Sequence, residues 1–459
     1  MRKHIIEFII ILLTICNIPL NAQNWAALGV GVYGNAVRCI YADTTNNALI
    51  VGGNFSQVGG IPAISIAKWN GTSWSSIGAG NPFTSYPVVA LNKYNGEIYA
   101  GSFSVGNGAL KKWNGTTWNN VGSGVYGIVW AMKIFNNELY ISGGFDTVGG
   151  MPCKGIAKWN GSNWTCIGMP SNITTSVTVN AICEYNGELY FGGQFYSTEY
   201  PNDTIQNIIR YDGNNWKSVG GGLHGGMDAV ACITIFKNEL YVAGTFIKAH
   251  GNVGNYIQKW NGTAWSEVGG GVMGINGGNG QISDLKVFHD ELYAVGVFSY
   301  AGGVPTQHIA KWNGTNWCGL GSTFNNTIGT LAIYNDTLYI GGGFTIIDGD
   351  TLNHIAKWTG GSYVDTCGNT TSIKEYRNNE NGIIVYPNPS TENITIEITD
   401  NELCPYSLQL FDVTGRLIKE EYFICDEKHI LDVSYFNPGL YFIKLTGSKC
   451  LYQGKLIKQ

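Results

Sequence analysis

Two histidines have a spacing that could support metal chemistry. His308 and His354 occupy the same position in neighbouring copies of a repeated phrase, each directly before Ile-Ala-Lys-Trp. Imidazole nitrogens held at equivalent positions of adjacent structural units can bind a metal ion between them. The alternative, which we favour, is that both histidines are surface polar residues at the start of a strand.

The remaining candidates lack the pattern that their chemistry needs. Asp348-Gly349-Asp350 is rich in oxygen ligands but does not have the spacing of a calcium loop. Residues 274–280 are rich in glycine, but no lysine or helix follows them, so they do not match a phosphate-binding loop. No serine or cysteine stands in a recognisable nucleophile motif. We therefore predict no catalytic residue, no metal and no cofactor.

The elements that would have to position any site come from an internal repeat. The phrase Ile-Ala-Lys-Trp-Asn-Gly-Thr-x-Trp, or a variant of it, recurs along the chain at intervals of about 45 to 50 residues. Each copy carries two aromatic residues five positions apart. The seven pairs are Trp69 and Trp74, Trp113 and Trp118, Trp159 and Trp164, Tyr211 and Trp216, Trp260 and Trp265, Trp312 and Trp317, and Trp358 and Tyr363.

A second phrase, of the form Glu-Leu-Tyr-x-Gly-Gly-x-Phe, lies upstream of each pair. Its phenylalanine is present in all seven copies, with a glycine two residues before it. Residues 88–94, 97–100, 110–113 and 118–121 read as four short strands in one unit, and Asn95-Gly96 is a strong two-residue hairpin signal. Such units predict an all-β fold, and we interpret residues 23–367 as a seven-bladed β-propeller.

We expect the paired aromatics to form the core between blades. The two rings of a pair project from the same face of the sheet, and indoles supply much buried area. The five all-tryptophan pairs are therefore predicted repeat-core residues, with a ligand platform as the alternative. The repeated glycines either allow close backbone approach or supply positive φ. In the Asn-Gly turns after Trp69 and its equivalents, we expect both residues to adopt positive φ.

One aligned position on the first strand of each unit is mostly small, as the crowded centre of a ring requires. Its seven residues are Cys39, Ala90, Ala131, Ala181, Cys232, Asp284 and Thr330. We interpret Cys39 and Cys232 as small core residues rather than disulfide partners. Asp284 is the exception: it could line a wet central channel or hold an ion. We favour the alternative, a solvated or hydrogen-bonded structural carboxylate.

Residues 25–29, Trp-Ala-Ala-Leu-Gly, match only the fourth strand of a unit and precede the first complete unit. A strand of this type can pair with the last blade and close the ring, which hides a sheet edge. The last unit's own fourth strand, at residues 362–365, has the weakest pattern of the seven, and this favours closure. The alternative is that residues 25–29 belong to an eighth, incomplete unit.

The doubled glycines, the Leu-Tyr before them and the paired aromatics resemble kelch-type repeats, which form the ring of galactose oxidase. The resemblance covers about residues 25–367 and implies the propeller fold. The aromatics are five residues apart here, whereas kelch units usually show six. The tyrosine and histidine copper ligands and the Cys–Tyr crosslink of galactose oxidase match no position of this sequence. The resemblance therefore implies the fold and not the activity.

The start of the chain predicts export. Residues 1–22 have a positive start, an apolar run and small residues before a cleavage site between Ala22 and Gln23, as signal peptides do. The run is shorter than the ~20 residues of a membrane-spanning helix, and no later stretch is long enough. The net charge of −5 and the lack of a basic cluster argue against nucleic acid as a partner. An oxidising compartment permits a Cys153–Cys166 disulfide if the strand register brings the two together.

After Cys367 the repeats stop. We interpret residues 368–382 as a polar linker and residues 383–459 as a small Ig-like β-sandwich, because their strands alternate apolar and polar residues. The motif residues are Tyr386, Pro387, Asn388, Pro389, Gly415, Pro438 and Gly439. This tail closely resembles the C-terminal sorting domain of the type IX secretion system. The resemblance implies a Bacteroidetes-type bacterium, the type IX machinery as a partner, and release or display at the outer surface. The alternative is an ordinary Ig-like binding module.

Two classes of function follow. The first is a non-catalytic binding or adhesion module whose glycan or protein ligand lies on one propeller face, shaped by the insertions at residues 196–206 and 269–281. The second is a secreted enzyme acting on glycans, with site residues from several blades. The near-uniform units favour the first, because an active site should break the pattern with clustered polar residues.

Overall fold

The computed structural model describes residues 24–360 and 383–459, with short gaps at 79–81, 84–85, 105, 174–176, 198–204, 250–251, 254, 276–277, 399–405, 414–415, 424–427 and 447–450. The chain divides into two compact units, Met1–Gly368 and Asn369–Gln459. Every named element in the described residues is a β-strand, which confirms the all-β prediction, and none of these residues form a helix able to span a membrane. The predicted signal peptide with its Ala22–Gln23 cleavage site, the linker, the strand at 362–365 and Gly415 lie outside the described residues.

The first unit is built from four-stranded antiparallel sheets that follow one another along the chain. The first three sets are β2 (Val32–Asp43), β3 (Ala48–Val58), β5 (Ile66–Trp69) and β6 (Trp74–Ser76); β7 (Val88–Tyr94), β8 (Glu97–Ser104), β9 (Leu110–Trp113) and β10 (Trp118–Asn120); and β11 (Val125–Phe135), β12 (Glu138–Gly143), β15 (Ile156–Trp159) and β16 (Trp164–Cys166). The next three are β17 (Thr178–Tyr185), β18 (Glu188–Tyr196), β19 (Gln206–Tyr211) and β20 (Trp216–Lys217); β21 (Leu223–Phe236), β22 (Glu239–Ala249), β24 (Ile257–Trp260) and β25 (Trp265–Glu267); and β27 (Gln281–Phe288), β28 (Glu291–Val297), β31 (Ile309–Trp312) and β32 (Trp317–Gly319). The last set is β33 (Ile328–Tyr334), β34 (Thr337–Gly342), β37 (Ile355–Trp358) and β1 (Trp25–Ala27).

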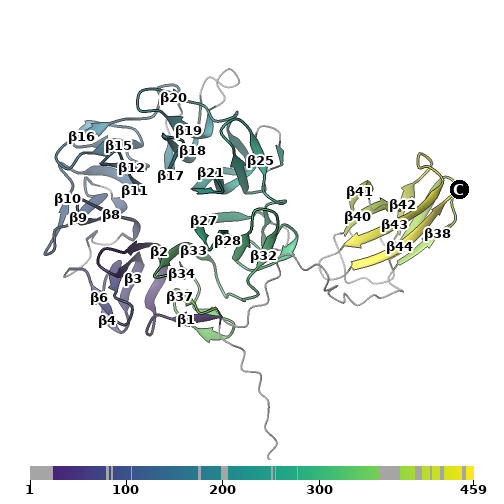
Figure 1. Cartoon of the computed structure of the whole chain (residues 1–459), viewed down its shortest axis with the longest axis horizontal. Coiled ribbons are helices and arrows are strands. Elements are labelled where there is room, and N and C mark those ends of the chain that lie inside the picture. The colour runs from purple at the N-terminus through teal and green to yellow at the C-terminus, as the bar shows by residue number, and fades with distance from the viewer. Residues whose placement is uncertain are drawn as a thin grey trace, which may run out of the picture. The chain divides into compact units, whose positions relative to one another are not determined.

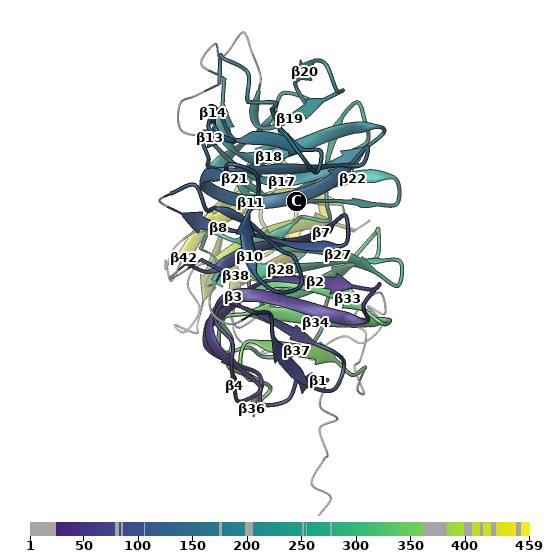
Figure 2. The same ribbon diagram turned by 90° about the vertical axis from the view of Figure 1, so that its left-hand side faces the viewer.

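These sheets lie around a common centre, and first strands such as β17, β21 and β27 lie nearest to it (Figure 1). Because the strands alternate in direction, the turns from first to second and from third to fourth strand lie at one end. We call this end the hairpin face; residues 95–96 and 70–73 are examples. The connections from second to third strand and from one sheet to the next lie at the other end, the loop face. Figure 2 shows the first unit from the side, so that strands such as β2 and β34 run across the view.

Short strands extend the connections at the loop face. They are β4 (Ile61–Pro62), β13 (Thr147–Val148), β14 (Met151–Pro152), β23 (Asn252–Val253), β26 (Val272–Met273), β29 (Tyr300–Ala301), β30 (Val304–Pro305), β35 (Ile346–Ile347) and β36 (Asp350–Thr351). Several pair with one another, as β13 does with β14 and β29 with β30. The connections of the loop face are therefore short hairpins in their own right.

Neighbouring sheets pack closely where a glycine on the second strand of one sheet lies against a valine on the first strand of the next. A Cβ added to Gly101 would lie 3.0 Å from Val129 Cγ1, and one added to Gly192 would lie 2.3 Å from Val230 Cγ1. The same relation joins the last sheet to the first, since a Cβ on Gly341 would lie 2.5 Å from Val37 Cγ1. The contact that links consecutive sheets thus also links the two ends of the series.

The N-terminal strand completes the last sheet, as the sequence led us to expect. β1 pairs with β37, and Trp25 stands opposite Trp358. Immediately after β1, the main-chain oxygen of Leu28 accepts a hydrogen bond from Trp74 Nε1 in the first sheet, at 2.7 Å. Burying β1 in this way satisfies the edge of β37 that would otherwise be open to another chain.

The repeated glycine serves close approach. In six sheets a Cβ at this position would meet a main-chain oxygen of the first strand, or of the residue just before it, at 2.3 Å or less, for example at 1.9 Å between Gly193 and Thr178. In the second sheet the register places Ser102, and not Gly101, at this position, because Val88 pairs with Ser102 as Val179 pairs with Gly193. The glycine two residues before the phenylalanine therefore has a different neighbour there.

The two kinds of Asn-Gly turn differ. At Asn95-Gly96 both residues have positive φ, 48° and 81°, as a two-residue hairpin requires. After Trp69 only Gly71 has positive φ, 100°, so our expectation for Asn70 was wrong. Asn70 instead accepts hydrogen bonds through Oδ1 from the main-chain N–H groups of Thr72 and Ser73, at 2.9 and 2.8 Å. Asparagine is needed here for its side-chain acceptor.

The register left open by the sequence brings Cys153 and Cys166 together. They form a disulfide with a sequence separation of 13 residues, joining the connection after β14 to β16. Cys39, Cys183 and Cys232 are free among the described cysteines. For Cys39 and Cys232 this agrees with their interpretation as small core residues.

The second unit has two sheets around one core. One is β38 (Ile383–Tyr386), β39 (Asn393–Ile398) and β42 (Lys428–Asp432); the other is β41 (Leu417–Phe423), β40 (Tyr406–Asp412), β43 (Gly439–Thr446) and β44 (Leu451–Lys458). Inward residues from both sheets, including Ile396, Leu410 and Ile443, are buried together. Their alternation with exposed residues matches the sequence pattern of half-buried strands.

Candidate functional site

The tryptophan pairs lie in the packing between sheets. Trp159 and Trp164 stand directly opposite each other, with ring centroids 5.0 Å apart. Trp164 Nε1 donates to the main-chain oxygen of Val121 in the preceding sheet at 3.0 Å, and Trp317 Nε1 does the same to Val268 at 2.8 Å. Of the ten predicted core residues, Trp69, Trp159, Trp164, Trp260, Trp265, Trp312 and Trp317 are buried, whereas Trp74, Trp113 and Trp118 are partly exposed.

Asp284 joins two neighbouring sheets near the centre of the first unit. Its carboxylate accepts hydrogen bonds from the main-chain N–H groups of Leu285 and of Leu331 on β33, both at 2.8 Å. Lys286 Nζ lies 3.2 Å from the same carboxylate, and the Asp284 side chain is 16% exposed. These partners occupy both carboxylate oxygens, as a structural carboxylate requires.

The two aligned histidines are buried, so our preferred interpretation of them as surface residues was wrong. His308 Nδ1 lies 2.9 Å from the main-chain oxygen of Gly296, and His354 Nδ1 lies 3.2 Å from that of Gly342. Burial lowers the pKa of both imidazoles, which keeps them neutral. Each holds its own sheet together, and within the described residues no three His, Cys, Asp or Glu side chains form a group able to hold a metal ion.

Two free thiols on the first strands, those of Cys183 and Cys232, are also buried. Burial raises the pKa of Cys183 to about 11 and that of Cys232 well above its usual range. The nucleophile is the thiolate, so both groups are chemically quiet at neutral pH. Packing and hydrogen bonding therefore account for Asp284, the two histidines, Cys183 and Cys232.

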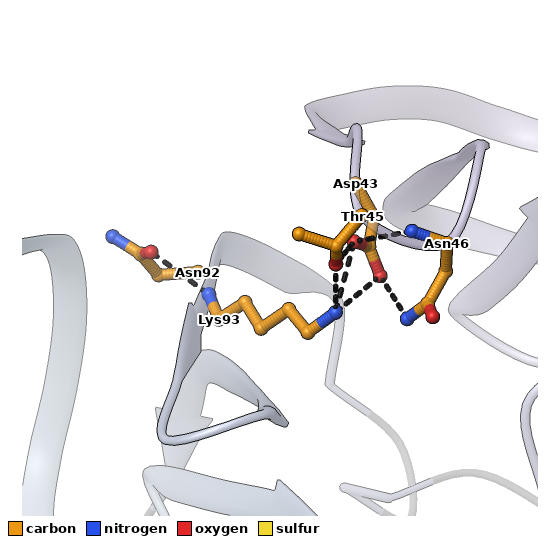
Figure 3. Close-up of polar contacts among 5 residues, drawn as sticks. All are labelled: Asp43, Thr45, Asn46, Asn92 and Lys93. Carbon is orange, nitrogen blue, oxygen red and sulfur yellow. Dashed lines mark hydrogen bonds and ion pairs between the residues drawn. The ribbon is translucent and has the colours of Figure 1, made fainter.

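At the hairpin face, polar contacts bind one sheet to the next. Asp43, 2% exposed at the end of β2, accepts hydrogen bonds from Thr45 and Asn46 in its own turn, at 2.6 and 2.7 Å (Figure 3). Lys93 Nζ of the second sheet reaches the same carboxylate at 2.9 Å. Burial alone would raise the pKa of Asp43, but the hydrogen bonds from Thr45, Lys93 and Asn46 outweigh it and lower the pKa to about 2.

Tyrosine hydroxyls make the same kind of contact further round the hairpin face. Tyr94 donates to the main-chain oxygen of Asn137 at 2.9 Å, and Tyr185 donates to that of Asn238 at 3.1 Å. Tyr334 of the last sheet donates to Asn47 Oδ1 of the first at 2.8 Å. This face is therefore a series of polar contacts between neighbouring sheets.

The loop face is different, because large apolar side chains gather there. Among the described residues of the first unit, the exposed large apolar side chains at this face are Val30, Tyr33, Ile61, Ile64, Tyr126, Met151, Tyr196, Met273, Ile275 and Ile346. Only Ile134 and Ile235 of this class lie elsewhere in the described part of the unit, near the hairpin ends of β11 and β21. We call the ten residues the loop-face apolar set.

Part of this set follows the repeat. Tyr33, Tyr126 and Met273 are 72, 48 and 52% exposed, and each follows a fully buried valine at the loop end of a sheet. Their cross-strand partners are equivalent, since Tyr33 faces Gln57 as Tyr126 faces Thr147. The sequence analysis missed these residues, although each stands in a copy of the phrase Gly-x-Gly-Val-x-Gly. The signal was the large apolar residue after its valine in three copies.

In the second unit, the Pro-Asn-Pro motif is tied to the end of the chain. Asn388 Nδ2 donates to the main-chain oxygen of Lys455 at 2.7 Å, and Asn388 Oδ1 accepts from the N–H of Ile457 at 2.8 Å. Ser390 continues this pairing, because its N–H donates to Ile457 and its oxygen accepts from Gln459, at 3.0 and 2.9 Å. The Asn388 amide thus satisfies main-chain groups of β44 as a neighbouring strand would.

The other predicted motif residues lie around this contact. Tyr386 ends β38, and its hydroxyl donates to Glu397 Oε2 at 2.9 Å. The bonds before Pro387 and Pro389 are both cis. Pro438 precedes β43 and Gly439 begins it, so the motif residues that the structure describes stand at strand ends.

The model of the family described as the secretion system C-terminal sorting domain matches residues 384–459. These residues form a C-terminal sorting domain. The chain is therefore a secreted or cell-surface protein exported by the type IX secretion system of a Bacteroidetes-type bacterium. The match covers most of the second unit and none of the first.

Other comparisons are distant. Searching the curated proteins gives no match. A crystal structure of a protein of unknown function from Bacteroides thetaiotaomicron is 12% identical, and the alignment covers 63% of this chain and 76% of that one, with a TM-score of 0.34. A Bacteroides ovatus structure titled xyloglucan PUL GH43B is 11% identical, and its alignment covers 94% of this chain and 91% of that one, with a TM-score of 0.24. Neither likeness carries an inference about this chain.

Proposed function

We propose that this protein is a secreted β-propeller that recognises a ligand with its loop face and does not catalyse a reaction. In this proposal residues 1–22 are a signal peptide, residues 23–367 form a seven-bladed, kelch-like propeller closed by β1, and residues 368–382 are a linker. Residues 383–459 are an Ig-like sandwich that directs export.

The observation that carries the proposal is the loop-face apolar set. Exposed aromatic and aliphatic side chains are costly when contiguous, and a soluble protein retains them mainly where another molecule covers them. Tyrosine and methionine are also frequent in recognition surfaces because they bury large areas. Tyr33 and Tyr126 recur at equivalent positions of separate sheets, which suits a ligand that spans several sheets.

Recognition is favoured over catalysis because the reactive groups near the centre are already engaged. The Asp284 carboxylate bonds main-chain N–H groups, and the aligned histidines bond main-chain oxygens. A general acid or base must face substrate, whereas these groups are held against the main chain. An enzyme acting on glycans remains the alternative outcome of the experiment below.

The experiment is an array of glycans, polysaccharides and surface proteins, probed with the secreted chain and read for both binding and product. We expect binding without turnover. A variant combining Tyr33→Ser and Tyr126→Ser should lose most of the bound signal. The control combines Ile134→Ser and Ile235→Ser, which removes exposed apolar side chains, 39 and 40% exposed, near the opposite end of the strands.

Each outcome has a distinct meaning. Product formation would replace the binding module with an enzyme. Equal loss of binding in both variants would show that the loop face is not the recognition surface. Binding retained by the control and lost by the tyrosine variant supports the proposal.

A further inference from the structure

The sorting domain carries an apolar patch on the outer face of its four-stranded sheet. Phe411 on β40 stands opposite Leu417 on β41 and Phe442 on β43, so three apolar side chains form one row across three strands. In the next row, Leu440 on β43 stands opposite Ile457 on β44. We call these five residues the sheet patch.

The exposure of the sheet patch is substantial. Leu417 is 45%, Phe442 is 40% and Ile457 is 46% exposed. Val413, 65% exposed, lies just beyond the end of β40 and extends the apolar area. Residues that directly face one another across strands are close enough for their side chains to touch, so these exposed groups form one continuous surface.

The next row of the same face is polar. The row beyond Phe411 contains Glu420, Gln409 and Lys444, and Gln409 Nε2 donates to Glu420 Oε1 at 2.8 Å. The sheet patch therefore lies at one end of the sheet, at the turn that joins β40 to β41. The polar row supplies control positions on the same strands.

Among its described side chains, the other sheet of the domain does not have such a surface. Ile384 and Ile430 are exposed there, but charged and hydroxyl groups separate them. Lys428 pairs with Glu397 at 3.3 Å, and the Tyr386 hydroxyl donates to that same carboxylate at 2.9 Å. An ion pair with a hydrogen-bonded hydroxyl is a stable solvated surface by itself.

We propose that the sheet patch is the surface with which the sorting domain docks on the type IX secretion machinery. We infer the docking partner from the family. Residues 384–459 match a domain that directs export, and such a domain must contact the export apparatus. The surface follows from chemistry, because a small exported domain keeps a contiguous apolar area exposed when a partner covers it. The partner surface is therefore an apolar one on a protein of the apparatus.

The Pro-Asn-Pro motif positions this surface. Asn388 bonds the main chain of β44 at Lys455 and Ile457, at 2.7 and 2.8 Å, and Ile457 is itself part of the sheet patch. The motif thereby fixes the strand that forms one side of the docking surface. Asn388 is therefore a positioning residue that holds β44 in place. In this proposal its side chain does not contact the partner.

The first test measures export of the full chain in a bacterium with a working type IX system. Leu440→Ser and Ile457→Ser, alone and combined, should move the protein from the surface and medium to the periplasm. The exported fraction should fall roughly tenfold per residue, the order expected when one large apolar side chain loses its burial against a partner. The matched control, Gln409→Ser with Lys444→Ser on the same face, should be exported as the parent chain is.

The second test does not depend on whether a variant folds. A photoreactive phenylalanine analogue placed at Phe442 in the full chain should crosslink to a component of the apparatus in living cells, and the same analogue at Gln409 or Ile384 should not. Normal export of the combined patch variant would overturn the proposal. A crosslink that forms at Ile384 and not at Phe442 would also overturn it and would move the docking surface to the other sheet.

Discussion

The hairpin face and the loop face of the first unit come from the same repeat, yet they present opposite surfaces. At the hairpin face the turns are short and polar, and side chains such as Tyr94 and Lys93 bond the neighbouring sheet. At the loop face the connections vary, and large apolar side chains such as Tyr33 and Tyr126 are exposed. Both faces contain contacts between neighbouring sheets, such as Trp74 Nε1 with the main-chain oxygen of Leu28 at the loop face, but only the loop face presents large apolar side chains in number.

The physical cause lies in the turns. The two-residue hairpins between first and second strands, such as Asn95-Gly96, have positive φ at both positions, so Asn, Asp and Gly recur there and the sequence is constrained. The connections of the loop face also contain many residues with positive φ, such as Gly59, Gly60 and His308, but their length and sequence differ from one sheet to the next. Variation at that end costs little stability, which is the condition under which a recognition surface can change.

The largest effect should come from breaking the buried contact at Asp43. Asp43→Ala leaves the Lys93 ammonium without its partner, and loss of one member of a buried ion pair costs about 3–5 kcal/mol. Denaturant unfolding of the secreted chain measures this. The control is Asp336→Ala at the same face, where the pair with His289 is 79 and 60% exposed and should contribute no more than about 1 kcal/mol. Similar losses of unfolding free energy in both variants would show that the buried pair at Asp43 is no more stabilising than the exposed pair at Asp336.

Acid should act through the same carboxylate. The pKa of Asp43 is about 2 in the folded chain against an ordinary value of 3.8, so its contribution is complete above the higher value and is lost as the pH falls through the lower one. The contribution is about 2 kcal/mol. Between pH 5 and pH 2 the parent chain should therefore lose about that much more stability than Asp43→Ala. Parallel pH profiles would contradict this.

The disulfide should have the next largest effect, at the loop-face side of the third sheet. Cys153→Ala with Cys166→Ala removes a crosslink with a sequence separation of 13 residues, which should cost about 3 kcal/mol. The equivalent positions of the first sheet are Ala63 and Ser76, since Ser76 faces Ala67 as Cys166 faces Ala157.

Ala63→Cys with Ser76→Cys should accordingly form a second crosslink, detectable by mass spectrometry without reduction. If it does not form, the two sheets differ in geometry more than their registers indicate. A parent-like unfolding midpoint for the Cys153 and Cys166 variant would show that this loop end does not need its crosslink.

The sequence predicted the repeated elements well because their causes are local. Trp25 could be recognised as a misplaced fourth strand, since it carries the same Trp-x-x-apolar-Gly pattern as Trp118, and β1 does pair with β37. The sequence left open whether Cys153 and Cys166 form a disulfide. The answer depends on strand register, which no local pattern determines.

The errors have physical causes too. His308 looked like a surface residue because histidine at the start of a strand is usually solvated, yet its φ of 62° turns it inward, toward the oxygen of Gly296. Tyr33 was passed over because it stands between glycines that suggest loop. The candidate surface was thus harder to predict than the fold, because exposure is a property of the assembled sheets.

A smaller effect is expected from the tyrosine hydroxyls of the hairpin face. Tyr94→Phe and Tyr185→Phe each remove one hydrogen bond to the next sheet and should cost about 1 kcal/mol. Tyr196→Phe, at a loop-face tyrosine that is 57% exposed, is the matched control and should change nothing measurable. Equal losses of unfolding free energy at the three positions would mean that the tyrosine hydroxyls of both faces form stabilising hydrogen bonds.

The smallest effect on stability should come from the loop-face apolar set itself. Tyr33→Ser, Tyr126→Ser and Met273→Ser replace side chains that are 72, 48 and 52% exposed, so each should change the free energy of unfolding by no more than about 0.5 kcal/mol. Thermal and denaturant unfolding of the secreted variants measure this directly. A loss above about 1 kcal/mol per residue would mean that these side chains hold the short strands of the loop face in place. The two faces would then share one structural role, and the apolar surface would no longer point to a ligand.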